Sequence, residues 1–239
     1  MVHIPESARG RLLHILRILE TVPEERKLTS TELETLAGWP SHTIRKDISC
    51  LYEFLETVKH SSEPRIPMDN EKYNSSSGAG YTAERLVPLI RKALGLDRRR
   101  KFCVVGLGRL GSAYLNLDPA SLGEFELAAG FDSNVNRVEI IKSSAPLYPA
   151  YKMEDVIGRL SIEIALLCIP AEAAQGAAER LAAAGIRGIV NFAPVILTLS
   201  GGRPGGGTDN SPGRPGNRPV AVRNVHVADE LRALAAGMG

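Results

Sequence analysis

Residues 101–114 read KFCVVGLGRLGSAY, an apolar run followed by three glycines in the spacing G-x-G-x-x-G. The apolar run is typical of a buried β-strand, and the residues after the glycines can begin a helix. A strand, a glycine turn and a helix in this order begin many dinucleotide-binding folds. No other feature of the sequence restricts the fold as strongly, because it predicts a β-α unit of a parallel sheet.

Strand and helix patterns alternate from Arg100 to the end of the chain. EIALLCIP at 163–170 is apolar throughout, as expected of a strand covered on both faces. This alternation predicts an α/β fold with a doubly wound parallel sheet of the Rossmann type. We expect strands at 102–106, 125–132, 163–170, 186–193 and 220–225, and helices at 110–117, 153–160, 171–185 and 228–238.

The first sixty residues have a helical pattern instead. An apolar stripe at positions 12, 15, 16 and 19 predicts a first helix. The capping-box spacing of Thr29 and Glu32 predicts a second helix through Ala37. After a break at 38–41, Ser41 is expected to be the N-cap of a third helix at 42–55. Two helices joined by a four-residue turn match the helix-turn-helix layout.

The third of these helices has two different faces. Its apolar stripe is formed by residues 44, 48, 51 and 55, and polar side chains lie on the opposite face. Such side chains can meet phosphates and base edges in a major groove, although a solvated helix face has the same pattern. The candidate DNA-contacting residues are His42, Thr43, Arg45, Lys46 and Ser49, together with Arg11 on the first helix.

Two polar stretches interrupt these patterns. Residues 56–80 contain two prolines and end in serines and glycines, which predicts a wing-like loop or linker. A connecting helix is expected at 82–95. Residues 201–219 contain eleven Gly or Pro in nineteen positions, which favours a flexible insertion. We therefore expect one domain at 1–80 and a second at 81–239.

Composition excludes several classes of protein. The net charge is only +2, and no segment is a basic tail, so any nucleic-acid contact depends on local placement of charge. The apolar runs are too short to cross a bilayer and no signal peptide is recognisable, so we expect a cytoplasmic protein that does not bind a membrane. The three cysteines and five histidines have no ligand spacing, so no metal site is expected.

The glycine turn predicts a dinucleotide site. Gly106 would permit the tight turn, Gly108 would let the backbone approach a pyrophosphate, and Gly111 would let the helix pack closely. Asp132 ends the next strand, where a ribose hydroxyl needs an acceptor, and its charge favours NAD over NADP. Arg137 is close enough to weaken that preference. The alternative is a glycine turn without a ligand and an Asp on the surface.

No catalytic set accompanies this candidate site. Downstream of the glycines there is no Ser/His/Asp combination, no Tyr-x-x-x-Lys pair and no pair of carboxylates in a credible cleft. A bound cofactor without reacting residues suggests a sensor rather than an enzyme. The alternative is a small nucleotide- or CoA-binding enzyme subunit whose helical N-terminus is only a dimerisation arm.

Five stretches of the sequence resemble the Rex family of redox-sensing transcriptional repressors. Together with the flanking residues, the similarity covers about 4–55, 78–200 and 219–236. The resembling stretches are IPESARGRLLHILRILE, IRKDISCLYEF, GAGYTAERL, VVGLGRLGSA and the segment 169–197, which begins IPAEAAQ and includes AAAGIRGIVNFAPVIL.

The resemblance implies a homodimer in which a winged-helix domain precedes an NAD(H)-binding domain and the C-terminal helix is exchanged between subunits. NADH would weaken binding to a palindromic operator, and NAD+ would leave it strong. Arg45 and Lys46 would touch DNA. The residues that would hold the cofactor are Gly106, Leu107, Gly108, Arg109, Leu110, Gly111 and Asp132, with Ile169, Pro170, Asn191, Phe192, Ala193 and Pro194 along the nicotinamide half.

The sequence departs from the family pattern at three places. Ser75, Ser76 and Ser77 stand where a basic residue usually precedes the wing glycines. Leu117 and His226 occupy positions where the family commonly has a Tyr and an Asp that couple across the dimer, and Tyr114 lies one turn away from Leu117. A DNA-binding protein that does not respond to redox state is therefore a third possibility.

Overall fold

The computed structural model describes residues 4–58, 80–199 and 220–238. These residues form two compact units, which divide between Arg98 and Arg99. The wing expected at 56–80 lies almost entirely outside the described residues, and the insertion expected at 201–219 lies entirely outside them.

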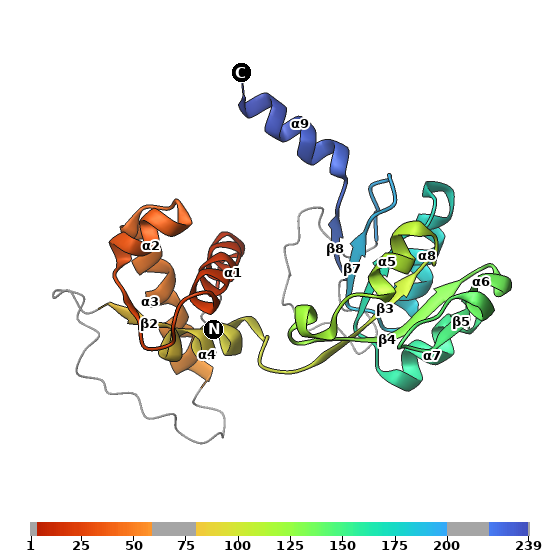
Figure 1. Cartoon of the computed structure of the whole chain (residues 1–239), viewed down its shortest axis with the longest axis horizontal. Helices are drawn as coiled ribbons and strands as arrows, with labels where there is room; N and C mark the ends of the chain where they lie inside the picture. The colour runs from red at the N-terminus through yellow and green to blue at the C-terminus, as the bar shows by residue number, and fades with distance from the viewer. Residues whose placement is uncertain (1–3, 59–79, 200–219, 239) are drawn as a thin grey trace. The chain divides into compact units, whose positions relative to one another are not determined.

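The first unit is a small helical domain with a two-stranded antiparallel sheet (Figure 1). Its apolar core is formed by residues of all four helices together with Ile4 and Leu28. The strand residue Leu28 pairs with Tyr81, so the sheet joins the two ends of the segment that contains the helix-turn-helix. The elements are α1 (Glu6–Glu20), β1 (Lys27–Leu28), α2 (Ser30–Ala37), α3 (Ser41–Val58), β2 (Tyr81–Thr82) and α4 (Ala83–Leu94).

The start of α2 confirms the predicted capping box, and the start of α3 differs from the prediction. The Thr29 hydroxyl accepts from the backbone N–H of Glu32, and the Glu32 carboxylate accepts from the backbone N–H of Thr29. Ser41 is the first helical residue of α3, not its N-cap, because the Pro40 carbonyl accepts the N–H of Ile44 at 3.2 Å. The backbone N–H of Ser41 donates to Glu34 of α2 instead.

The boundary between the units lies later than the predicted boundary after residue 80. Helix α4 is amphipathic, and Leu86, Leu89 and Ile90 are buried in the same core as α1 and α3. The apolar face of α4 therefore belongs to the first unit, which continues to Arg98.

The second unit is a six-stranded, entirely parallel sheet in the order β5-β4-β3-β6-β7-β8. Helices α7 and α8 pack in one apolar cluster against the sheet, and α5 packs in another. The strands are β3 (Arg100–Val105), β4 (Phe125–Asp132), β5 (Leu147–Pro149), β6 (Ile164–Leu167), β7 (Gly188–Asn191) and β8 (Ala221–Asn224). The α-helices are α5 (Arg109–Leu115), α6 (Val135–Ile140), α7 (Met153–Leu160), α8 (Ala171–Ala183) and α9 (Val227–Gly237).

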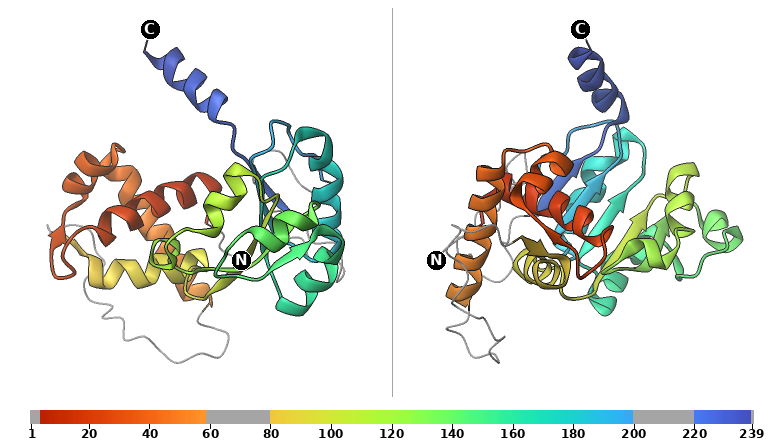
Figure 2. Two further views of the ribbon diagram at one scale, coloured as in Figure 1. Left: turned by 45° about the vertical axis from the view of Figure 1, so that its right-hand side comes forward. Right: turned by 60° about the vertical axis from the view of Figure 1, so that its left-hand side comes forward.

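This topology confirms the predicted doubly wound sheet. The chain order reverses between β3 and β6, which lie side by side. Such a switch point leaves a crevice at the carboxyl ends of the strands. Among the strands and α-helices of this unit, α6 and β5 have no counterpart among the predicted ones. Figure 2 shows α9 extending beyond the sheet from the end of β8.

An ion pair with a buried carboxylate joins α1 to α3 in the first unit. Arg11 donates to both carboxylate oxygens of Asp47, at 2.6 and 2.8 Å. The Asp47 side chain is only 5 % exposed, whereas that of Arg11 is 23 % exposed. Hydrogen bonds to Asp47 also raise the pKa of Arg11 above its usual value. Arg11 is therefore the partner of a carboxylate that has little access to water.

We expect Arg11→Met to lower the free energy of unfolding of the first unit by about 3 kcal/mol, because it leaves a buried carboxylate without its partner. Urea unfolding monitored by the fluorescence of Trp39, the only tryptophan, measures this unit directly. Glu20→Gln is the control, since its ion pair with Arg91 is more exposed and should contribute less than about 1 kcal/mol. An equal loss of unfolding free energy in the two variants would contradict the prediction that the Arg11–Asp47 pair contributes more than the exposed pair.

Candidate functional site

The turn after β3 requires glycine at two positions. Gly106 has φ +90°, and a Cβ there would lie 2.5 Å from the Cys168 carbonyl oxygen. A Cβ at Gly111 would lie 1.8 Å from the Gly106 carbonyl oxygen, so α5 packs directly against the turn. Gly108 differs, because a Cβ there would have no atom within 4 Å. The backbone at Gly108 therefore faces open space.

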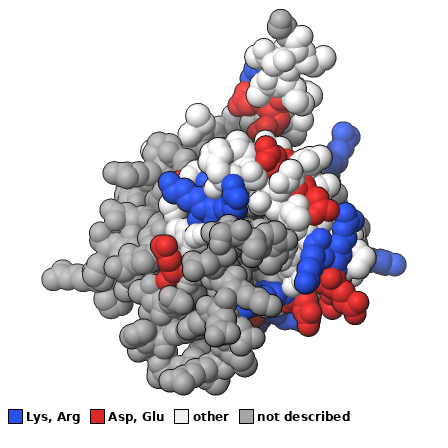
Figure 3. All heavy atoms as spheres, turned by 90° about the vertical axis from the view of Figure 1, so that its left-hand side faces the viewer, with Lys and Arg blue, Asp and Glu red and all other residues white. Residues whose placement is uncertain are grey.

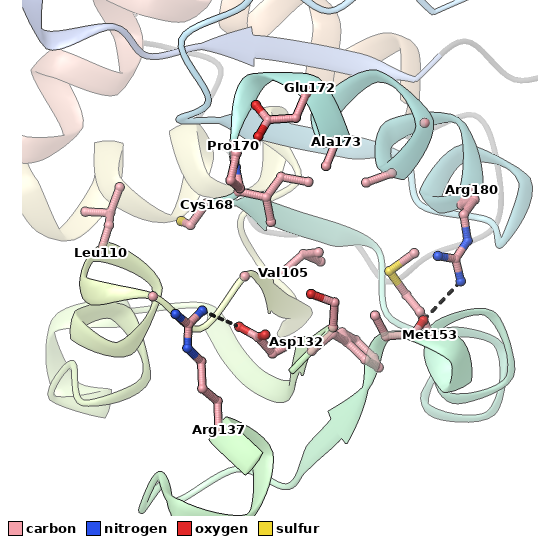
Figure 4. A pocket seen from close by; sticks show the side chains of 18 of the residues that line it. Val105, Leu110, Asp132, Arg137, Met153, Cys168, Pro170, Glu172, Ala173 and Arg180 are labelled. Atoms are coloured by element: carbon pink, nitrogen blue, oxygen red, sulfur yellow. Dashed lines mark hydrogen bonds and ion pairs between the residues drawn. The ribbon is translucent and has the colours of Figure 1, made fainter. Parts of the chain in front are cut away.

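Asp132 holds this turn from the end of β4. Its carboxylate accepts the backbone N–H of Leu107 on one oxygen and that of Asn134 on the other, both at 2.7 Å. Arg137 lies 3.5 Å from the oxygen that binds Leu107 (Figure 4). Asp132 is only 4 % exposed, so the alternative of an unattached Asp on the surface is wrong.

A cavity of about 710 Å³ lies in front of the turn and Asp132. It is at the carboxyl ends of β3, β4 and β6, where the strand order reverses. Figure 4 shows Leu110, Cys168 and Pro170 on one side of the cavity and Met153 and Arg180 on another. Its position and its size are those of a site for a nucleotide-sized ligand.

One wall of the cavity was not predicted from the sequence. Ala173, Gly176 and Ala177 of α8 line the cavity, with Met153 of α7 beside them. Arg180, one turn further along α8, is held by both oxygens of Glu154 and by the Ala150 carbonyl. The sequence feature that could have indicated this wall is the spacing of small residues along one face of α8.

The first group of predicted cofactor residues comes together around this cavity. Gly106, Gly108, Arg109, Leu110, Asp132, Ile169 and Pro170 line it. Leu107 is buried, and its backbone N–H binds Asp132. Gly111 lies behind the turn.

The second group, at the end of β7, does not line the cavity. Asn191 is fully buried, and the ring of Phe192 packs on that of Tyr114 with centroids 5.2 Å apart. Ala193 and Pro194 instead line a second cavity of about 360 Å³, together with Asn224, Val225 and His226. His226 also forms a hydrogen bond to Asp229, which lowers the pKa of that carboxyl.

The predicted DNA-contacting residues lie mainly on one helix. His42, Arg45, Lys46 and Ser49 of α3 are exposed, and Thr43 is half-buried. The opposite face buries Ile44, Ile48 and Leu51, while the side chain of Leu55 lies outside the described residues. Exposure of these residues is compatible with a DNA contact and with a solvated face. Arg11 differs, since its guanidinium is bound to Asp47.

Comparisons with known proteins identify the family. The Redox-sensing transcriptional repressor Rex of Thermus thermophilus is 38 % identical over 200 residues, covering 82 % of this chain and 83 % of the relative. That of Levilactobacillus brevis is 27 % identical over 97 % of this chain and 92 % of the relative. The chain belongs to the Rex family of redox-sensing transcriptional repressors.

Solved structures extend this likeness to the fold. The crystal structure of RSP, a Rex-family repressor, is 27 % identical, with a TM-score of 0.72, covering 100 % of this chain and 96 % of RSP. The structure of RSP in complex with NAD+ and operator DNA has a TM-score of 0.73 at 26 % identity, covering 100 % of this chain and 94 % of that one. The predicted architecture is thereby confirmed for the described residues.

A family model of CoA-binding domains matches residues 97–195, which lie almost wholly in the second unit. This match describes the same kind of sheet and does not favour the enzyme-subunit alternative, because the Rex family consists of transcriptional repressors. Within the described residues, no helix is long and apolar enough to span a membrane. No three His, Cys, Asp or Glu side chains of the described ranges are grouped to hold a metal ion.

The thiol of Cys168, which lines the cavity, should react slowly in the folded protein. Burial raises the pKa of Cys168 to about 11. At pH 8 we expect iodoacetamide to alkylate Cys168 roughly 100-fold more slowly in the folded protein than after unfolding, because the thiolate is the reacting form. The rate should rise with pH up to that pKa. Peptide mass spectrometry measures it, with Cys103 as the slower-reacting control, since burial raises its pKa to about 12. Equal rates for folded and unfolded Cys168 would contradict the prediction.

Proposed function

We propose that this chain is an NADH-responsive repressor that binds operator DNA as a homodimer through α3 and binds NADH or NAD+ in the large cavity. The observation that carries the proposal is the glycine turn, with Asp132 buried behind it, in the same chain as helix α3, whose exposed face carries Arg45 and Lys46. The RSP complex with NAD+ and operator DNA supports the same combination. Such a repressor meets its DNA in the cytoplasm.

The residues that line the cavity favour NAD(H) as its ligand. The open backbone at Gly108 suits a pyrophosphate, as it does in Rossmann folds. A carboxylate has about four acceptor positions, so Asp132 can accept from ribose hydroxyls while it holds two backbone N–H groups. Its negative charge would repel a 2′-phosphate, which favours NAD(H). Arg137 reduces that repulsion, because it lies beside the same carboxylate.

The two ends of the cavity suit different parts of the dinucleotide. The adenosine half belongs on the Asp132 side, where Met153 and the small residues of α8 form an apolar wall. The nicotinamide half belongs towards Ile169 and Pro170, on the β6 side. The contacts of Phe192, Ala193 and Pro194 with the nicotinamide stay a prediction.

The exposed face of α9 supports a homodimer. Val227, Leu231, Leu234 and Met238 repeat along one side of the helix and are all more than 60 % exposed. In Figure 3, where α9 is at the top, its upper part is free of charged side chains and the acidic residues lie near its base. Exposed apolar stripes of this kind mark interaction surfaces. A second copy that exchanges its own α9 would cover both stripes.

The response to NADH then requires only that NADH bind with different affinities to two forms of the dimer. A two-fold dimer carries two α3 helices, which fit successive major grooves when they lie about 34–36 Å apart. NADH must bind more tightly to a dimer in which this spacing is lost. A nearly complete shift takes about 5 kcal/mol of preference, which two bound nucleotides supply jointly. No hydride transfer is needed.

The central test is fluorescence anisotropy of a labelled palindromic duplex, selected by this protein from a randomised pool in the presence of NAD+. At fixed salt we expect NADH to raise the Kd for the duplex at least about tenfold, whereas NAD+ leaves it low. A redox-indifferent DNA-binding protein would bind equally with both nucleotides. A nucleotide-binding enzyme subunit would not bind the duplex.

The double variant Arg45→Ala/Lys46→Ala tests the assignment of α3. We expect its affinity for the duplex to fall at least about 100-fold, and the slope of log Kd against log salt to fall by about one for each phosphate that the variant no longer neutralises. The NADH affinity should not change. Lys142→Ala/Arg159→Ala is the control, since it removes the same charge from exposed positions on the second unit. A similar loss in both variants would indicate non-specific attraction only.

Gly176→Leu tests the cavity as the dinucleotide site. Its Cβ would meet no atom within 4 Å, so the leucine side chain can enter the cavity without disturbing α8. We expect the Kd for NADH to rise at least about tenfold, because the added side chain occupies apolar space that the adenosine half needs. Gly158→Leu on α7 is the matched control, since Gly158 is also helical and unobstructed but lies outside the cavity wall. Titration of NADH fluorescence measures both, and unchanged affinity in Gly176→Leu would contradict the assignment.

A further inference from the structure

The buried side chain of Asn191 binds two separate segments. Its Nδ2 group donates to the Val195 carbonyl at 2.7 Å and to the Asn224 side-chain oxygen at 2.9 Å. Its Oδ1 accepts the backbone N–H of Ala193 at 3.0 Å. Asn191 has no exposed surface, so these partners replace water. One amide group thus fixes the turn at 192–195 and reaches the neighbouring strand.

The second segment leads directly to α9. Asn224 is the last residue of β8 and the register partner of Asn191 in the parallel ladder. The next residue, Val225, donates its backbone N–H to the Asn191 carbonyl at 2.8 Å. His226 then forms the N-cap position of α9. The backbone and the side chain of Asn191 therefore both hold the segment from which the apolar helix begins.

The turn at 192–195 is connected to the glycine turn on its other side. Phe192 packs on Tyr114, which lies on α5. Helix α5 begins at Arg109, directly after Gly108, and Arg109 lines the large cavity. A continuous set of contacts therefore leads from the cavity through Phe192 and Asn191 to the start of α9.

We infer that the Asn191–Asn224 hydrogen bond couples the nucleotide cavity to α9, so that these two asparagines are positioning residues for the response to NADH. The inference rests on the proposed function, because it concerns how NADH binding reaches the dimer. Asn191 does not touch the large cavity, so its predicted direct contact with the cofactor is replaced here by an indirect role. A hydrogen bond that only stabilises the fold would change the free energy of unfolding and leave the coupling intact.

The measured quantity is the coupling factor, the ratio of the Kd for the duplex with saturating NADH to the Kd without it. Asn224→Ala removes the acceptor for Nδ2, whereas Asn224→Asp keeps an oxygen there. We expect the coupling factor to fall at least about fivefold in Asn224→Ala and to be retained in Asn224→Asp. By linkage, the effect of the duplex on the Kd for NADH must change by the same factor. Asn136→Ala, the same truncation at an exposed position on α6, should leave the factor unchanged.

The outcomes separate the inference from the proposed function. If the wild-type protein shows no effect of NADH on the duplex, both are wrong. If the wild type responds and Asn224→Ala responds equally, the inference alone is wrong. Hydrogen exchange on the wild-type protein provides a second measurement that does not depend on how a variant folds. NADH without DNA should change protection at both 192–195 and 221–231, and a change confined to the cavity residues would overturn the inference.

Discussion

The hydrogen bond from the Leu107 backbone to Asp132 is the contact on which the candidate cofactor site depends. It ties the turn after β3 to the end of β4, the neighbouring parallel strand. Gly106 and Gly111 make this arrangement possible, because a side chain at either would collide with backbone. The same carboxylate then faces the cavity with acceptor capacity remaining. The Asp132 carboxylate therefore holds the turn in place and is also available to bind a ligand in the cavity.

The sequence predicted the parts of the fold that depend on local rules. The Thr29 capping box, the glycine turn and the apolar strand β6 are each specified by residues close together in the chain. The predictions failed where distant partners decide. The amphipathic helix α4 has an apolar face that suits either unit, and only its packing on α1 assigns it to the first. Ser41 has the side chain of an N-cap, but Glu34 binds its backbone N–H.

The candidate sites show the same limit. Asp132 was identified because the end of the second strand is a fixed place in a Rossmann fold. Asn191 was assigned to the cofactor by the family resemblance, and Arg11 was named as a candidate DNA contact on the first helix. In the structure both side chains bind other parts of the protein. A polar residue in such a stretch can act on the ligand or on the backbone that meets it, and sequence does not separate these roles. Burial does, since Asn191 has no surface left for a ligand.

Buried polar groups at the ends of strands also explain how a sensor can work without catalytic residues. An apolar contact tolerates small shifts, whereas a buried amide that loses its acceptor costs about 1–3 kcal/mol. A turn held by such an amide therefore has few low-energy positions, and a ligand that moves it must move its partners as well. Asn191 is in this situation, because its acceptors lie on two segments. The free energy of a few hydrogen bonds is comparable to the differential affinity that a two-state repressor needs from each nucleotide.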